Sequence, residues 1–457
     1  MAKRTAWIQI IFVLFGASLA WGDVTVAPVF SEGMVLQANL ACPIFGSADP
    51  GERVVVECRG LSWETAANPE GRWLARMTPA APGGPHSLTI RGKNTLLLKN
   101  VLFGEVWVAS GQSNMQFPLK RAEGAAPEIA RASHPGLRYF RSGSQKWDEC
   151  TPETAGTFSA MAYYFARELM GRIRTPVGIL DLSVDGAVAQ TFVSEESLKE
   201  TPEFARKLAR QTDQKVSENH RLHFKPVLPY AIRGAIWCQG EGNRGCPATY
   251  KTLLPFLVAD WRRQWGQGDF PFLIVQLVNS QDRRDEPWEG RDCAIREAQL
   301  QTSGSVPNTA LVVTIDLGVK DVHYPKKRPA GERLALAARA LAYGEKIEYS
   351  GPLYESAKFS DGTCILSFTH LGSGLLPPGD RLTGFLLSGK DGRFSRAEAK
   401  IEGDHVIVWS PKIADPAAVR YAWERNPACN LSNREGLPAS PFRSDGFDSP
   451  YFQDETK

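Results

Sequence analysis

The segment Gly104–Met115 reads GEVWVASGQSNM, and the interpretation of the whole chain starts from it. Its apolar half, Val106–Ala109, has the length and composition of a buried strand. Small and polar residues follow the strand, and Ser113 lies within the turn that they predict. A serine hydroxyl becomes a nucleophile only when a base accepts its proton and a third group orients that base. The turn is therefore a candidate catalytic site that needs partners from elsewhere in the chain.

Those partners occur far downstream, in the sequence Asp321-Val322-His323-Tyr324-Pro325. His323 can act as the base, and Asp321, two residues earlier, can orient its imidazole. Asp316, at the end of a predicted strand, is the alternative orienting carboxylate. The neutral imidazole would be the active form, so the reaction rate should fall at acid pH.

Apolar runs alternate with helical patterns from residue 101 onward. Further strands are expected at 177–182, 234–238, 272–277 and 310–315, and helices around 158–169, 254–265 and 331–343. This alternation predicts a parallel sheet that is covered by helices on both faces. Sites in such sheets lie beyond the carboxyl ends of the strands. Ser113, Gly186, Gln239 and Asp316 all follow predicted strands, which argues for one shared site.

Short β-rich segments flank this α/β region on both sides. Residues 23–100 contain strand-sized runs separated by Gly, Pro and Asn, which is typical of a small antiparallel sandwich. Strand patterns return from about residue 346. We expect an N-terminal leader at 1–22, a β domain at 23–100, an α/β domain at 101–345 and a β-rich domain at 346–457.

The first 22 residues have the features of an export signal. Lys3 and Arg4 precede an apolar run at 6–15, and small residues lead to plausible cleavage after Ala20 or Gly22. The run is short for a membrane span, so an uncleaved anchor is the less favoured alternative. We therefore expect a secreted or periplasmic protein with no stable membrane span after signal removal.

Composition argues against several classes of partner. The 457 residues carry a formal net charge of +3 and no long Lys/Arg run, so we expect no nucleic acid. His, Cys and carboxylate residues do not cluster at zinc spacing, and glycine-rich phosphate loops are absent, so we expect no metal and no cofactor. Of the eight cysteines, Cys238 with Cys246 and Cys42 with Cys58 are candidate disulfide pairs; buried free thiols are the alternative.

Three motifs occur together in a recognisable order. GQSNM follows the strand EVWVA, WCQGEGN spans 237–243, and DVHYP spans 321–325. This combination resembles the sialate O-acetylesterase family, within the wider SGNH (GDSL-like) hydrolases. The resemblance covers nearly the whole mature chain, because it extends to FSEGMVLQ at 30–37, GERLA at 331–335, VRYAW at 419–423 and GLPASPFR at 436–443.

The resemblance implies an α/β fold, with a flavodoxin-like SGNH hydrolase core of parallel strands flanked by small N- and C-terminal β domains. It also implies a secreted carbohydrate O-acetylesterase that acts on an O-acetylated sugar or glycan through a serine acyl-enzyme. Ser113 would be the nucleophile and His323 the general base. The oxyanion donors would be the amides of Ser113 and Gly186, plus a side-chain amide from Gln239 or, as second choice, Asn243.

Two departures from the family pattern leave alternatives open. Relatives usually have Trp-Gly-Gly-Thr where this chain has Val184-Asp185-Gly186-Ala187, and Cys238 replaces a common aromatic residue. Asp185 would repel the developing negative charge if it pointed inward, and we expect it to point away. The alternatives are an acetylxylan or other polysaccharide acetylesterase, or a carbohydrate-binding protein with a degenerate site. The sequence does not indicate the oligomeric state.

Overall fold

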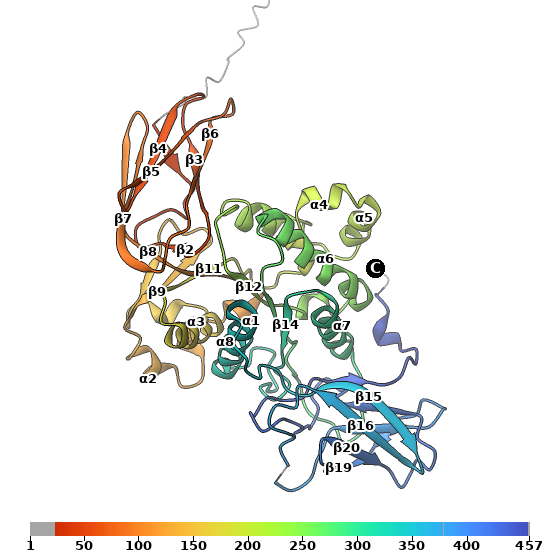
Figure 1. The fold of residues 1–457 in the computed structure, drawn as a ribbon. Coiled ribbons are helices and arrows are strands. Elements are labelled where there is room, and N and C mark those ends of the chain that lie inside the picture. Colours follow the sequence, from red (N-terminus) through yellow and green to blue (C-terminus); the bar gives the residue numbers. More distant parts are fainter. Residues whose placement is uncertain (1–22, 378, 456–457) are drawn as a thin grey trace, which may run out of the picture.

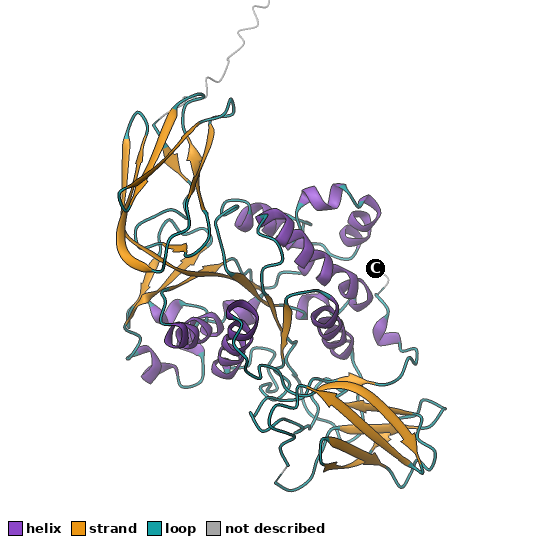
Figure 2. Cartoon of the chain, viewed as in Figure 1, coloured by secondary structure: helices purple, strands orange, loops and turns teal. Residues whose placement is uncertain are grey.

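The computed structural model describes residues 23–377 and 379–455 as a mixed α/β fold with β-rich regions at both ends (Figure 1). The expected export signal at 1–22 lies outside the described residues. Helices gather around the middle of the molecule, and strands dominate its two ends (Figure 2). The α/β centre and the two β-rich flanks predicted from the sequence are confirmed.

A parallel sheet forms the centre, in the strand order β9-β11-β8-β12-β13-β14. A short strand, β10, pairs antiparallel with β9 at one edge. The bounds are Thr95–Gly111 for β8, His134–Arg141 for β9, Asp148–Cys150 for β10, Val177–Asp181 for β11, Gly234–Cys238 for β12, Phe272–Val275 for β13 and Thr309–Val312 for β14. Each strand predicted from an apolar run is therefore present.

Helices cover both faces of this sheet, which explains why its strands are apolar throughout. Ile236 and Leu273 belong to one hydrophobic cluster with residues of α3 and α8. The next residues along the same strands, Trp237 and Ile274, belong to the other cluster, with residues of α6 and α7. Successive side chains of a strand point to opposite faces. The helices span Ala160–Ile173 (α3), Pro247–Trp265 (α6), Arg291–Ser305 (α7) and Lys327–Tyr343 (α8).

The N-terminal β region shares a strand with the central sheet. The first half of β8 pairs with β7, and its second half pairs with β11 and β12. The other strands are Thr25–Val26 (β1), Val35–Gln37 (β2), Cys42–Ser47 (β3), Arg53–Cys58 (β4), Leu61–Ala66 (β5), Arg72–Met77 (β6) and Gly83–Arg91 (β7). All pair antiparallel except β2, which runs parallel to β8. The expected boundary after residue 100 lies within β8, and the division into domains stays a prediction.

The C-terminal region contains two four-stranded antiparallel sheets. One has the order β15 (Leu353–Ser360), β16 (Thr363–Thr369), β20 (His405–Trp409) and β19 (Glu398–Glu402); the other has β18 (Ser395–Arg396), β17 (Phe385–Ser388), β21 (Ala418–Tyr421) and β22 (Phe442–Arg443). Buried Arg296 joins this region to the centre. Its guanidinium donates to the carbonyls of Leu277 and Val278 and to those of Glu424 and Arg425.

Several elements were not expected from the sequence, among them the edge strand β10 and its neighbour β9. Short helices also fill the connections: α1 (Ser113–Gln116), α2 (Ala125–Ile129), α4 (Glu195–Lys199), α5 (Pro202–Arg210), a π-helix at His220–Phe224, and 3-10 turns at Leu119–Arg121, Ala155–Thr157, Ala189–Phe192, Glu241–Asn243 and Pro450–Phe452. Their patterns are too short for a periodicity to stand out. Across the described residues, we find no helix with the length and apolar character of a membrane span.

The cysteines are all free thiols, so neither candidate disulfide is present. Seven of the eight are buried, in agreement with the alternative that the sequence left open. Burial raises the pKa of the Cys42 thiol to about 12. These side chains therefore act as small apolar groups of the core.

Candidate active site

The close pairing of two parallel strands, β8 and β12, positions the turn that carries Ser113. Gly111 ends β8 with φ +124, and a Cβ atom there would lie 2.0 Å from the carbonyl oxygen of Cys238 on β12. The next amide, that of Gln112, donates to the same oxygen at 3.0 Å. Only glycine fits both the backbone angle and the close approach. Ser113 follows at the start of α1, beyond the carboxyl end of β8.

Ser113 and His323 line the same pocket, which has a volume of about 200 Å³. Two segments remote in sequence therefore meet, as the motifs predict. The full lining consists of Ser113, Gln116, Phe117, Pro118, Arg121, Asp185 and His323. Among the described residues, no direct hydrogen bond joins the Ser113 hydroxyl to the imidazole. Such bonds are often long without substrate and shorten when it binds.

Asp321 is the carboxylate beside His323. Its Oδ1 lies 3.5 Å from His323 Nδ1 and accepts a hydrogen bond from the His323 amide at 2.8 Å. The alternative carboxylate, Asp316, instead forms a two-bond ion pair with Arg333, at 2.7 and 2.6 Å. The geometry thus favours Asp321 over Asp316 as the orienting group.

The loop after β11 runs beside the Ser113 turn. Val184 donates to Gly111 O at 3.0 Å, and the Gln116 side chain donates to Ser183 O at 2.8 Å. Gly186 has φ +67 and is exposed. Within the described part of the chain, the amides of Ser113 and Gly186 donate to no acceptor. Both N–H groups are consequently free for a ligand oxygen.

Asp185 was expected to point away from the site. It is exposed, and it is one of the residues that line the pocket with Ser113 and His323. Val184, the residue before it, packs against the core. The direction in which the Asp185 carboxylate points stays a prediction.

Gln239 and Asn243 are not brought into the pocket. Both are buried, and Gln239 Nε2 donates to Asn243 Oδ1 at 2.7 Å. Asn243 in turn accepts from the amide of Ala189 at 2.9 Å and donates to Gln190 Oε1 at 2.8 Å. The two side chains hold the 187–190 segment that follows Gly186, so the geometry gives them a supporting position behind the site.

Two residues beneath the pocket were missed by the sequence reasoning. The Asn114 amide donates to Val322 O at 3.0 Å and to Glu241 Oε1 at 2.6 Å, and Lys327 Nζ donates to Asn114 Oδ1 at 2.5 Å. Burial lowers the pKa of Lys327 to about 7, although Cys238 and Glu241 act in the opposite direction. The sequence offered a signal for Asn114, which is part of the GQSNM motif. It offered none for Lys327, because a Lys-Lys pair before a helix is typical of solvent-exposed charge.

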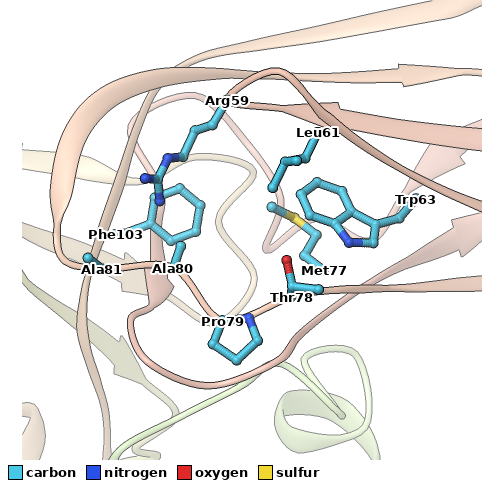
Figure 3. Close-up of a pocket in the computed structure, with 9 residues that line it drawn as sticks. All are labelled: Arg59, Leu61, Trp63, Met77, Thr78, Pro79, Ala80, Ala81 and Phe103. Carbon is cyan, nitrogen blue, oxygen red and sulfur yellow. The ribbon is translucent and has the colours of Figure 1, made fainter.

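Another hollow lies in the N-terminal β region and has different chemistry (Figure 3). Its volume is about 170 Å³, and the Arg59 guanidinium lies 5.6 Å from the centre of the Phe103 ring there. Trp63 and Met77 also line it, but no histidine does. Among residues 23–377 and 379–455, no three His, Cys, Asp or Glu side chains gather in a way that could hold a metal ion.

Comparisons with known proteins agree with the motifs. A family model described as "Carbohydrate esterase, sialic acid-specific acetylesterase" matches residues 103–339. Human sialate O-acetylesterase is 28% identical over 91% of this chain and 91% of its own length, and the mouse protein is 27% identical over 90% and 92%. The crystal structure of a carbohydrate acetylesterase from Xanthomonas citri has a TM-score of 0.86 and 34% identity, and the match covers 93% of this chain and 100% of that one. Since the family model spans more than half of the chain, including Ser113 and His323, the chain is an esterase and belongs to this sialic acid-specific acetylesterase family of carbohydrate esterases.

Proposed function

We propose that this esterase removes O-acetyl groups from a sugar or glycan through an acetyl-Ser113 intermediate. One observation carries the proposal: Ser113 and His323 line a common pocket, with Asp321 beside the imidazole. A nucleophile, a base and an orienting carboxylate are the three parts that acyl transfer by serine needs.

The reaction would proceed in two steps. Ser113 Oγ attacks the acetyl carbonyl while His323 takes its proton, and the carbonyl oxygen becomes negatively charged. The carbon–oxygen bond to the sugar then breaks, and His323 gives the proton to the departing sugar hydroxyl. Water, deprotonated by the same imidazole, attacks the acetyl-serine, and His323 returns that proton to Ser113 as the bond to Oγ breaks. Acetic acid leaves and ionises to acetate in solution.

The amides of Ser113 and Gly186 would stabilise the oxyanion. Neither has another acceptor among the described residues, and preorganised N–H donors are worth most where charge develops. A third donor from Gln239 or Asn243 stays a prediction. Both of these amides donate to protein oxygens behind the pocket.

We also infer that the central sheet is the flavodoxin-like core of the SGNH hydrolases. The strands β11-β8-β12-β13-β14 have the order 2-1-3-4-5 when numbered along the chain, with β9 added at the edge. Ligands bind such sheets beyond the strand carboxyl ends, where the order reverses. Ser113 follows β8, beside that reversal.

Export to the periplasm or medium is a further proposal, supported by the leader pattern of residues 1–22. Sequencing the amino terminus of the protein from its host would test it. A mature chain that starts near residue 21 or 23 is expected, and an intact Met1 would contradict it.

The identity of the sugar depends on charges that the pocket itself supplies. Arg121 would attract the carboxylate of a sialic acid, whereas Asp185 would repel it. The mammalian relatives are named for sialate and the bacterial one for carbohydrate in general. We propose an acetylated sialic acid as the first substrate, and a neutral sugar such as acetylated xylan as the second, which Asp185 favours.

Measurement of acetate release tests the mechanism and distinguishes the two proposed substrates. Wild type, Ser113→Ala and His323→Ala would be assayed on acetylated sialic acid, acetylated xylan and 4-nitrophenyl acetate, with Ser110→Ala as the matched serine control. Ser110 donates to Leu182 O inside the fold, so that variant should keep most of its turnover. Near-normal turnover by Ser113→Ala would remove the mechanism. Sugar binding without any turnover by wild type would indicate a degenerate site.

A further inference from the structure

We propose that Lys327 is a positioning residue of this active site: it holds the side chain of Asn114, which joins the turn carrying Ser113 to the turn carrying His323. The inference rests on the proposed roles of Ser113 and His323. It adds a buried lysine that the acyl-transfer steps do not themselves use.

Asn114 makes the connection between the two turns. It directly follows Ser113, and its amide donates at 3.0 Å to the carbonyl of Val322, which directly precedes His323. One side chain therefore spans from the residue next to the nucleophile to the residue next to the base. The distance between Ser113 and His323 depends on this bridge, because the two segments are otherwise remote in sequence.

Lys327 fixes which way the Asn114 amide faces. An asparagine has an acceptor oxygen and a donor nitrogen, whereas a lysine ammonium has donors only. Lys327 Nζ lies 2.5 Å from Asn114 Oδ1, so the oxygen faces the lysine. The nitrogen then faces Val322 O and Glu241 Oε1, both of which are acceptors. The three neighbours together leave one orientation for the amide.

The surroundings of Lys327 are unusual for a lysine with a purely structural role. The residue is 1% exposed, and Nζ lies 3.5 Å from the centre of the Tyr324 ring and 4.8 Å from that of Phe117. Among the described residues, no carboxylate lies within 4 Å of Nζ; Glu241 is reached only through Asn114. A buried ammonium group without a direct ion pair is destabilising. Apolar packing alone would be met better by methionine or leucine, so the nitrogen donor of Lys327 has another role.

Removing the ammonium group should therefore affect turnover more than binding. Without it, Asn114 Oδ1 is buried and unpaired, and the bridge to Val322 loses its fixed orientation. His323 then samples positions away from Ser113. The side chains that line the pocket remain, so a bound sugar would still find its contacts.

The first test is Lys327→Met in the full chain, with Lys326→Met as the matched control. Methionine keeps much of the length of lysine but has no donor, and Lys326 is exposed. We expect kcat to fall roughly 10- to 100-fold, in line with the rate effect of small misplacements, while KM stays within about threefold. Lys326→Met should match wild type. A kcat for Lys327→Met within about twofold of wild type would overturn the proposal.

A double-mutant cycle separates positioning from general loosening of the fold. If Lys327 acts through Asn114, Asn114→Ala lowers kcat by a similar factor, and adding Lys327→Met lowers it less than about twofold further. Two losses that multiply would contradict the proposed route. Should Lys327→Met fail to fold, Lys327→Gln retains an amide donor, and its kcat should lie between wild type and Asn114→Ala; a kcat equal to either would count against the proposal.

Ser113→Ala in the same assay distinguishes failure of the proposed function from failure of the proposed role of Lys327. Turnover by Ser113→Ala would refute the proposed function itself. An inactive Ser113→Ala beside a fully active Lys327→Met would refute only the role of Lys327.

Discussion

The active site consists of an exposed layer and a buried layer, and the two are built differently. The exposed layer comprises half-buried Ser113 and His323 together with exposed Asp321 and Asp185, which share few hydrogen bonds. The buried layer comprises Asn114, Lys327, Gln239 and Asn243, whose polar atoms are joined to named partners. The comparison indicates that the groups proposed to contact substrate make few bonds within the protein, while their positions are set by the buried groups beneath them.

The largest expected effect comes from disrupting the close pairing of β8 with β12, which supports both layers. Gly111→Ala would put a Cβ atom 2.0 Å from Cys238 O at a residue with φ +124. We expect the free energy of unfolding to fall by about 3 kcal/mol or more, measured by urea denaturation. Gly171→Ala is the matched control, because Gly171 lies in α3 with no atom near the added methyl group. That variant should be slightly stabilised. Equal stability of Gly111→Ala and wild type would contradict the close approach of β8 and β12.

The next largest effect shows which of two carboxylates, Asp321 or Asp316, orients the proposed base His323. Asp321→Ala should lower kcat roughly 10-fold, because the Asp321 side chain is 68% exposed and orients the imidazole only weakly. This loss is much smaller than the about 10 000-fold loss expected for a buried aspartate of a Ser-His-Asp triad. Asp316→Ala breaks the ion pair with Arg333 and should change kcat less than about threefold. Steady-state rates of the two variants decide the matter. A larger loss for Asp316→Ala would reverse the assignment.

A third prediction tests the buried layer through pH. Burial holds the pKa of Lys327 near 7 in the folded chain, far below that of an unfolded lysine. Between about pH 7 and 10 the unfolded chain therefore binds more protons at this residue, and folding stability rises with pH. Relative to Lys327→Met, wild type should gain up to about 1.4 kcal/mol per pH unit in this range. Urea denaturation of both proteins at pH 7 and pH 9 measures the difference; a difference independent of pH would contradict a buried titrating lysine.

The smallest effect concerns the charge that the exposed layer places in the pocket. Asp185→Asn should raise kcat/KM for a neutral acetyl ester roughly two- to threefold at low salt, because a negative charge near the developing oxyanion is removed. The gain should shrink at high ionic strength. Asp404→Asn, on an exposed turn of the C-terminal region, should change nothing. A loss of activity in Asp185→Asn would instead indicate that Asp185 binds substrate.

Strands that are buried on both faces could be predicted from local sequence patterns. Gly234–Cys238 and Phe272–Val275 are uninterrupted apolar runs, because both sides of each strand pack against helices. Strand β9, next to the edge strand β10, escaped prediction because its sequence, HPGLRYFR, mixes charge with apolar residues. In the site, Ser113 and His323 were predicted from the order of motifs.

The rest of the site depends on contacts between distant segments. Nothing local distinguishes buried Lys327 from exposed Lys326, since only the packing of Tyr324 and Phe117 covers the former. Gln239 follows its strand as expected, yet its amide faces Asn243 because that oxygen lies 2.7 Å away. Tertiary hydrogen bonds of this kind leave no periodic trace in a sequence.

Labelling with diisopropyl fluorophosphate tests the central claim most directly, because it reports an activated serine irrespective of the sugar. We predict one label per chain on Ser113, loss of activity in step with labelling, and much slower labelling of His323→Ala. Stoichiometric label on a different residue, or full activity with Ser113 labelled, would contradict the account.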